Sequence, residues 1–212
     1  MDPAPRSHAL PLTLLALVSA ALVLSGIGPY DRPTWWMETA PVMAALPLLA
    51  LTYRRFPFTT VSYLLMAYFA VVLVVGGHYT YARVPVGNWV KDALDLSRNH
   101  YDRMGHVFQG VIPAMVGREL LLRTSGLRRG GWLFTCCTSL ALAISALYEL
   151  LEWGTAVVAG DGSVAFLGTQ GDPWDAQSDM LCALTGAIVS QLLLARLQDR
   201  QLARLLGGAG AE

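Results

Sequence analysis

Charged side chains are scarce in this chain of 212 residues. Only 14% of the residues are charged and 54% are hydrophobic, whereas about a quarter are charged in ordinary soluble domains. The 15 basic and 15 acidic residues cancel, so composition supplies no basic surface for nucleic acid. These shortages argue against a soluble domain and a nucleic-acid-binding protein, and they favour a protein embedded in the lipid bilayer.

Cysteine and familiar catalytic motifs are also rare or missing. The three cysteines, Cys136, Cys137 and Cys182, lie in apolar runs, and an odd number is a poor disulfide framework. We interpret them as small buried apolar residues. The HExxH, GxSxG and P-loop patterns are absent. Any reaction must therefore be inferred from where single polar side chains lie.

Six apolar stretches come close to the 20 or so helical residues that cross a bilayer core of about 30 Å. The predicted spans are residues 9–28, 36–53, 56–77, 102–122, 132–159 and 177–197. The first is interpreted as a span, because Gly26 to Pro29 does not resemble a signal-peptide cleavage site. The predicted fold is an all-α, polytopic transmembrane helical bundle. It forms one membrane domain, residues 1–206, followed by a flexible tail, residues 207–212.

The basic residues predict the orientation of these spans. Lys and Arg near span ends gather on the cytoplasmic side of a membrane. With the amino terminus inside, ten basic residues face the cytoplasm and five, Arg32, Arg83, Lys91, Arg98 and Arg103, face outward. Both termini are therefore expected in the cytoplasm. The segment from Val86 to Asn99 is predicted to form a short helix on the outer surface.

Polar and ionisable side chains concentrate in the last three spans. Such residues are costly inside a membrane and by default indicate a site. They are Asp102, His106 and Gln109 in the fourth span, Glu149 and Glu152 in the fifth, and Asp172, Asp175 and Asp179 at the start of the sixth. Spacings of three and four place each set on one helical face.

These three faces are expected at the same depth. His106, Glu149 and Asp179 each lie 17 residues from the cytoplasmic end of their span, which is about 25 Å of helix. This depth corresponds to the outer boundary of the hydrocarbon. The loop from Phe166 to Asp175 lies on the same side and is a candidate lid.

Several carboxylates at close quarters need protons or a metal to balance their charge. One histidine with carboxylates and a glutamine suits Mg²⁺, Mn²⁺ or Ca²⁺, with Zn²⁺ as a further option. Helical bundles build metal sites with similar spacings. The predicted metal ligands are Asp102, His106, Glu152, Asp175 and Asp179, and the predicted catalytic carboxylates are Glu149 and Asp172.

Simpler interpretations remain open for each residue. Asp102 and Asp175 also suit helix caps, and Glu149 and Glu152 also suit neutral packing residues or partners of Arg103. Arg118 and Glu119, near the cytoplasmic end of the fourth span, are expected to reach the membrane interface or to pair with each other's neighbours.

Three runs of sequence resemble a known family. They are Tyr101-Asp102-Arg103-Met104-Gly105-His106 with Gln109-Gly110 and Arg118-Glu119, then Ser145 to Trp153, then Phe166 to Asp172 with Trp174 to Met180. Together they resemble the YjdF-like family of bacterial inner-membrane proteins. The resemblance implies a multi-span protein of the bacterial cytoplasmic membrane. It adds weight to the seven predicted site residues and supplies no substrate.

Three functions follow from the polar cluster. The first is a metal-dependent hydrolase or transferase that acts on a lipid or lipid-linked group at the outer leaflet. The second is a small transporter that couples to an ion or a proton, and the third is a structural protein whose acids hold helices together. Few polar residues continue from the cluster through the membrane, which favours a one-sided site over transport. The expected partner is the bilayer and, in the first case, a lipid-linked substrate.

Overall fold

The protein is all-helical in a computed structural model that describes residues 8–159 and 170–207. Within these residues there are seven α-helices, one short 3₁₀ helix and no strand. The helices are α1 (Ala9–Ser25), α2 (Arg32–Thr52), α3 (Thr60–Tyr79), η1 (Tyr81–Arg83), α4 (Pro85–Ala93), α5 (Tyr101–Thr124), α6 (Gly131–Ala159) and α8 (Asp175–Gly207). The predicted all-α class is confirmed.

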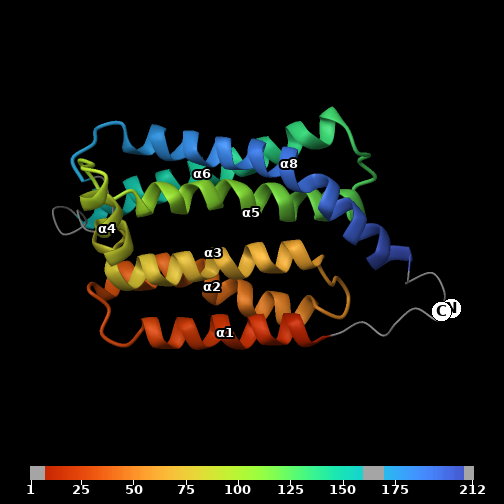
Figure 1. Ribbon diagram of the computed structural model, residues 1–212, viewed down its shortest axis with the longest axis horizontal. Coiled ribbons are helices and arrows are strands. Elements are labelled where there is room, and N and C mark those ends of the chain that lie inside the picture. The colour runs from red at the N-terminus through yellow and green to blue at the C-terminus, as the bar shows by residue number, and fades with distance from the viewer. Residues whose placement is uncertain (1–7, 160–169, 208–212) are drawn as a thin grey trace.

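The six long helices lie side by side and alternate in direction (Figure 1). Helices α1, α2 and α3 form one half of the bundle, and α5, α6 and α8 form the other, with α3 against α5. Helix α1 begins and α8 ends at the same end of the bundle, opposite α4. The predicted topology, with both termini on one side of the membrane, requires this arrangement.

Each predicted span corresponds to one long helix. Helices α3, α6 and α8 are long and apolar enough to cross a membrane, and α1 is a shorter apolar helix. Helices α2 and α5 carry more polar residues, which include Glu38 and His106. Six spans, their orientation and the single-domain limits therefore stay predictions. The predicted tail beyond residue 207 lies outside the described residues.

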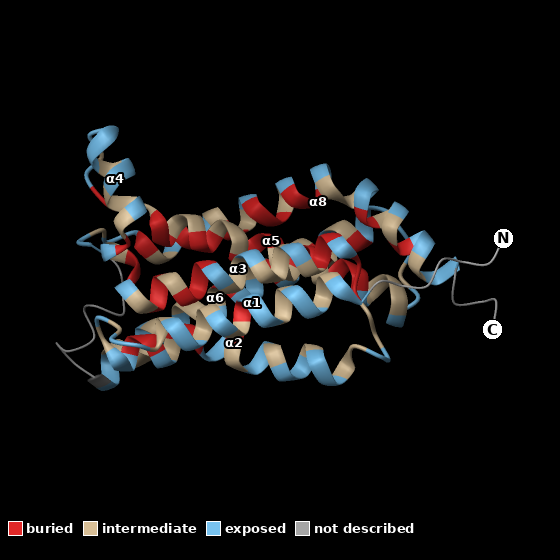
Figure 2. Cartoon of the chain, turned by 60° about the horizontal axis from the view of Figure 1, so that its bottom comes forward, coloured by how far each residue is buried: buried red, intermediate tan, exposed pale blue. Residues whose placement is uncertain are grey.

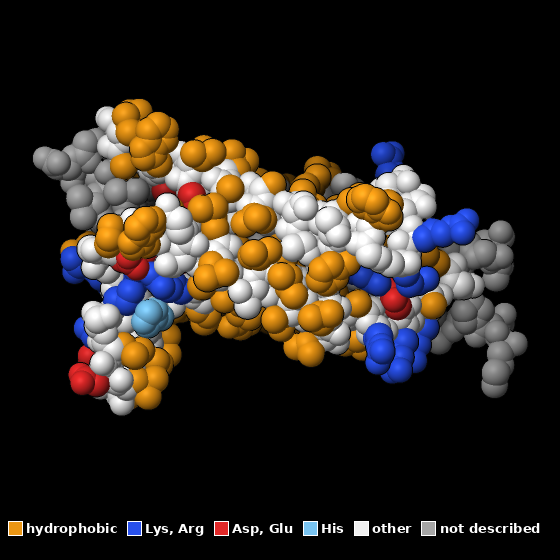
Figure 3. Space-filling model, turned by 90° about the horizontal axis from the view of Figure 1, so that it is seen from above, with side chains coloured by type: hydrophobic (Ala, Val, Ile, Leu, Met, Phe, Trp, Pro, Cys, Tyr) orange, Lys and Arg blue, Asp and Glu red, His pale blue; other side chains and the backbone are white. Residues whose placement is uncertain are grey.

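The surface of the bundle carries an apolar band. Figure 3 shows hydrophobic side chains over the middle of the molecule and Lys and Arg at its two ends. Leu150 of α6 and Leu192 and Leu193 of α8 are each more than 60% exposed. A continuous exposed apolar surface is costly in water and favourable in lipid. This surface agrees with a bundle that sits in a bilayer.

Helix α5 is the centre of the packing (Figure 2). Buried positions run along its whole length, whereas the only buried residue of α1 is Val18. Helices α5 and α8 approach through glycine. A Cβ added at Gly110 would meet the Ala183 carbonyl oxygen at 1.8 Å, and one at Gly186 would meet that of Val107 at 2.1 Å. Small residues allow this close backbone contact between membrane helices.

The predicted surface helix is shorter than expected. Helix α4 buries no residue, as predicted, but it ends at Ala93 and not at Asn99. Asp95 adopts a left-handed φ of 50°, which breaks the helix, and Asn99 is only 1% exposed. The Asn99 side chain donates to the carbonyl oxygens of Ala82 and Val84. Asn99 thereby ties the α4 segment to the bundle.

Of the two interpretations of Arg118 and Glu119, exposure at the membrane interface is wrong and pairing with neighbouring charges is confirmed, with Asp199 at 2.9 Å and Arg123 at 3.2 Å. Neither side chain reaches the surface, since Arg118 is 5% exposed and Glu119 is fully buried. Glu119 accepts hydrogen bonds from the Thr59 backbone at 3.0 Å and from Ser62 at 2.8 Å. The local sequence resembles an interfacial pair, but α3 and α8 cover this face of α5 in the tertiary structure.

Candidate metal centre

Side chains from α5, α6 and α8 converge near the end of the bundle that carries α4. Asp102 and His106 lie one turn apart on α5, and Asp179 lies one turn into α8. One potential ligand atom from each of these three residues lies within 4.8 Å of the others. Glu149 of α6 joins them, with its Oε1 atom 3.6 Å from His106 Nδ1. The expectation that the three polar faces meet is thus met.

These four residues, Asp102, His106, Glu149 and Asp179, are called the metal-centre cluster below. Asp102, His106 and Asp179 are buried, at 8%, 5% and 2% exposure. The Glu149 side chain is 10% exposed. A charged cluster so far from water needs internal compensation.

Gln109 orients the histidine. Its Oε1 atom lies 2.8 Å from His106 Nδ1, and an amide oxygen at this distance accepts a hydrogen bond from the N–H at that nitrogen. The other ring nitrogen, Nε2, is then free to act as a ligand, and it lies 3.6 Å from Asp102 Oδ1. Metal-binding histidines are commonly held this way, with the second nitrogen donating to a neighbour.

Two oxygen atoms of the cluster lack partners. Asp179 Oδ1 and Glu149 Oε1 are both buried, and neither has a hydrogen-bond partner in the described part of the chain. A buried carboxylate oxygen without a donor loses its hydration and gains nothing in return. These atoms are suited to ligate a cation.

Two arginines form a layer above the cluster, and one of them, Arg98, also lies 3.9 Å from Asp102. Arg98 pairs with Asp175, and Arg103 pairs with Asp172 at 2.5 Å and with Asp175 at 3.5 Å. Asp172 also accepts from the Trp174 backbone, and this bond together with Arg103 lowers the pKa of the Asp172 carboxyl. Asp172 and Asp175 are therefore neutralised by arginine. These pairs favour a positioning role for both, although each was predicted to act on metal or substrate directly.

The cluster borders a small polar cavity of about 20 Å³. Its lining includes Asp102, His106, Glu152 and two residues absent from the predicted site, Glu38 and Tyr148. Glu38 is 2% exposed and accepts a 2.6 Å hydrogen bond from the Tyr148 hydroxyl. The volume suits one water or one ion. Glu152, predicted as a ligand, faces this cavity beside the cluster.

Glu38 could have been found from the sequence. It is the only acidic residue within the predicted second span, and an acid in an apolar span indicates a site. Arg98 gave no comparable signal, because it precedes α5 and resembles an ordinary interfacial charge. The structure folds it inward to 8% exposure beside Asp102, at 3.9 Å.

The loop before α8 is described only from Gln170 onward. The side chain of Gln170 accepts from the Asn99 backbone N–H at 3.0 Å and donates to the Asn99 carbonyl at 2.9 Å. This pair fixes the start of α8 against the start of α5. The predicted lid residues from Phe166 to Thr169 lie outside the described residues.

The residues fit a single divalent ion. Two ligands of one ion with bonds of about 2.0 to 2.5 Å lie at most about 5 Å apart, which agrees with the cluster. Three potential ligands, one imidazole and two carboxylates, lie within 4.8 Å of one another, and Glu149 lies beside them at the Nδ1 edge of His106. The carboxylates exceed the available positive charge, because no arginine forms an ion pair with Asp179 or Glu149 among the residues described. A cation would balance this excess.

Comparisons with known proteins place the chain in a family. A family described as "Predicted membrane protein (DUF2238)" matches residues 10–200. The chain belongs to this family. It is also similar to the inner membrane protein YjdF of Escherichia coli (strain K12), with 50% identity over 201 residues, which cover 94% of this chain and 92% of that protein.

The family and this relative confirm the resemblance drawn from the three sequence runs. They also confirm the prediction of a membrane protein of the bacterial inner membrane. No solved structure matches the chain.

Proposed function

We propose that this protein binds one divalent metal ion at Asp102, His106 and Asp179, with Glu149 beside it. With this ion it would hydrolyse or transfer a group on a lipid or lipid-linked substrate. The observation that carries the proposal is the convergence of these ligand atoms within 4.8 Å, together with the unpartnered Asp179 oxygen.

The metal would polarise an ester or phosphoryl oxygen and lower the pKa of a bound water. Glu149 is placed to act as the general base. Its unpartnered Oε1 atom faces the His106 ring, so it can accept a proton from a water held in the cluster. Glu152 and Glu38 line the adjoining cavity, which has room for one water beside the ion.

The packing below the cluster supports a one-sided site over a transport path. The α5 and α8 backbones touch at Gly110 and Gly186, directly on the cytoplasmic side of His106 and Asp179 in the predicted orientation. Backbones in contact leave no room for a hydrated ion between these helices. The Asp179 Oδ1 atom, which has neither a hydrogen bond nor an ion pair among the described residues, likewise disfavours a purely structural role for that acid.

Metal content tests the proposal. Full-length protein purified in detergent, after incubation with Mn²⁺, Zn²⁺, Mg²⁺ or Ca²⁺ and desalting, is analysed by mass spectrometry for bound metal. We expect about one ion per chain in the wild type, and loss of that ion in His106→Ala and Asp179→Asn. Asp92→Asn, on the exposed surface of α4, is the matched control and should keep the ion.

Monodisperse wild-type protein that holds none of the four ions would overturn the proposal. So would Asp179→Asn protein that retains a full equivalent, because the site would then lie elsewhere. Loss of metal in the cluster variants would justify a search for lipid hydrolysis with Glu149→Gln as the catalytic variant.

A further inference from the structure

A second, much larger cavity lies between α1, α2 and α3. Its volume is about 370 Å³, within the range of about 300–1,000 Å³ that is usual for ligand pockets. The lining is almost wholly apolar and includes Val18, Val42, Leu46 and Ala70. A cavity of this kind can bury a hydrocarbon chain favourably but provides no polar partner for a charged ligand.

The few polar atoms of the lining are already engaged. The Tyr63 hydroxyl accepts from the Phe58 backbone at 3.1 Å, and the Tyr53 hydroxyl pairs with His8 at 2.7 Å. Both tyrosines lie at the end of the cavity far from α4. The occupant is therefore apolar over the length of the cavity.

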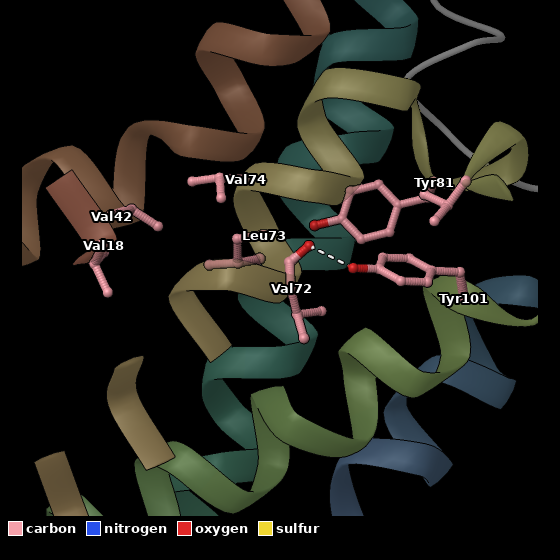
Figure 4. Close-up of a cluster of buried hydrophobic side chains, with 8 residues drawn as sticks. Val18, Val42, Val72, Leu73, Val74, Tyr81 and Tyr101 are labelled. Carbon is pink, nitrogen blue, oxygen red and sulfur yellow. Dashed lines mark hydrogen bonds between the residues drawn. The ribbon is translucent and has the colours of Figure 1, made fainter. Parts of the chain in front are cut away.

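The two cavities share a wall. Phe69 and Leu73 of α3 line the large apolar cavity and also the small polar cavity beside Asp102 and His106. Figure 4 shows Leu73 between Val18 and Val42 on one side and Tyr81 on the other. Tyr81 itself lines the polar cavity. An apolar chamber thus abuts the candidate metal centre.

The large cavity extends from this wall toward the opposite end of the bundle. Along α2 and its C-cap the lining runs from Pro41 to Tyr53, which is about 18 Å of helix at 1.5 Å per residue. It also reaches the surface, because Leu12 belongs to its lining and is 60% exposed. That surface lies in the apolar part of the bundle, where lipid chains would be the neighbours.

We infer that the α1–α2–α3 cavity holds one hydrocarbon chain of an amphiphilic substrate, whose polar group passes Phe69 and Leu73 to reach the metal centre. The inference rests on the proposed function and specifies its substrate class: a lipid with a chain next to the reacting ester or phosphoryl group. The chain lies with its first carbons at Leu73 and its methyl end near Tyr53 and Tyr63.

Photocrosslinking in lipid nanodiscs tests this placement. Two phospholipid probes carry a diazirine in one chain, either near the carbonyl or near the methyl end, and crosslinked residues are mapped by mass spectrometry. We expect the first probe to label Phe69 and Leu73 and the second to label Tyr53 and Tyr63. Labels on the exposed residues Leu192 and Leu193 measure non-specific contact.

Filling the cavity should remove the specific labels. In Ala70→Phe the added ring occupies space that the lipid chain would otherwise fill. The chain then loses contacts of about two methylene groups, and we expect labelling to fall about tenfold. Ala67→Leu is a milder second variant, should Ala70→Phe fold poorly. Ala143→Phe, on an exposed position of α6, is the matched control and should leave all labels unchanged.

The result is separable from metal binding. Asp179→Asn protein should keep the cavity labels although it loses the ion, because the chain contacts only apolar side chains. Specific labelling in wild-type protein that itself binds no metal would overturn the proposed function while supporting a lipid site. Labelling equal to that of Leu192 and Leu193, or unchanged in both filled variants, would overturn the chain site even if the metal binds.

Discussion

Buried acidic clusters lie toward both ends of the helix bundle, and they differ in how completely their oxygens are paired. The first is the metal-centre cluster near α4. The second, here called the Glu119 cluster, consists of Thr59, Ser62, Glu119 and Arg123. Each contains a carboxylate on α5 or α8 that is nearly inaccessible to water.

In the Glu119 cluster both oxygens of the acid are satisfied. Glu119 Oε1 accepts from the Thr59 backbone and from Arg123 at 3.2 Å, and Oε2 accepts from the hydroxyls of Thr59 and Ser62, each at 2.8 Å. Thr59 is the N-cap residue of α3, so the acid that accepts from its N–H also holds the start of this helix. An acid with this many donors holds helices together and needs no further ligand.

The metal-centre cluster has the opposite character. Asp179 and Glu149 each have a buried oxygen without a donor among the described residues, and the nearest arginines are already paired with Asp172 and Asp175. A buried carboxylate without a partner destabilises the folded protein. We therefore expect a ligand that binds these carboxylates to offset this cost. The comparison teaches that pairing, more than burial, separates a structural acid from a ligand-binding one.

The largest expected effect on stability is that of replacing Glu119. Glu119→Ala would leave Arg123 without its carboxylate and Thr59 and Ser62 without their acceptor, and should lower the free energy of unfolding by about 3–5 kcal/mol. Thermal unfolding in detergent measures the loss, with Asp92→Ala as the exposed control. A change within that of the control would contradict the assignment of Glu119 as structural.

Replacing Asp179, an acid of the metal-centre cluster, should change the free energy of unfolding in the opposite direction. In metal-free protein, Asp179→Asn removes an unpaired buried charge, and its stability should equal that of the wild type or exceed it by about 1–2 kcal/mol. Thermal unfolding with a chelator present measures this difference. A strong destabilisation in the absence of metal would show that Asp179 is a structural acid like Glu119.

The smallest effect is expected at Asp172, in the arginine layer. The Trp174 backbone N–H and Arg103 lower the pKa of Asp172 in the folded protein, so these contacts contribute stability above the ordinary pKa of aspartate, and that contribution disappears as the pH falls through the lowered value. The difference in melting temperature between wild type and Asp172→Asn should therefore be present at neutral pH and vanish in acid. A difference that is constant with pH would contradict the ion pair.

Much of the architecture could be predicted from the sequence. Apolar runs located all six long helices, and spacings of three and four placed the acids on common faces. The equal count of 17 residues from the span ends predicted that His106, Glu149 and Asp179 would meet. The extent of α4 and the position of Arg98 could not be predicted, because both depend on contacts that Asn99 and Asp175 make with distant segments.

Composition, motifs and helical periodicity predicted the membrane class, the family and the residues that can ligate a metal. Which acids are paired depends on the tertiary structure. Glu119 and Asp179 are both acids within predicted spans, and the local sequence of neither shows how many donors surround it. Donors from α3 surround the first, whereas the second faces His106 and other carboxylates, and pairing of this kind depends on the packing of segments far apart in the chain.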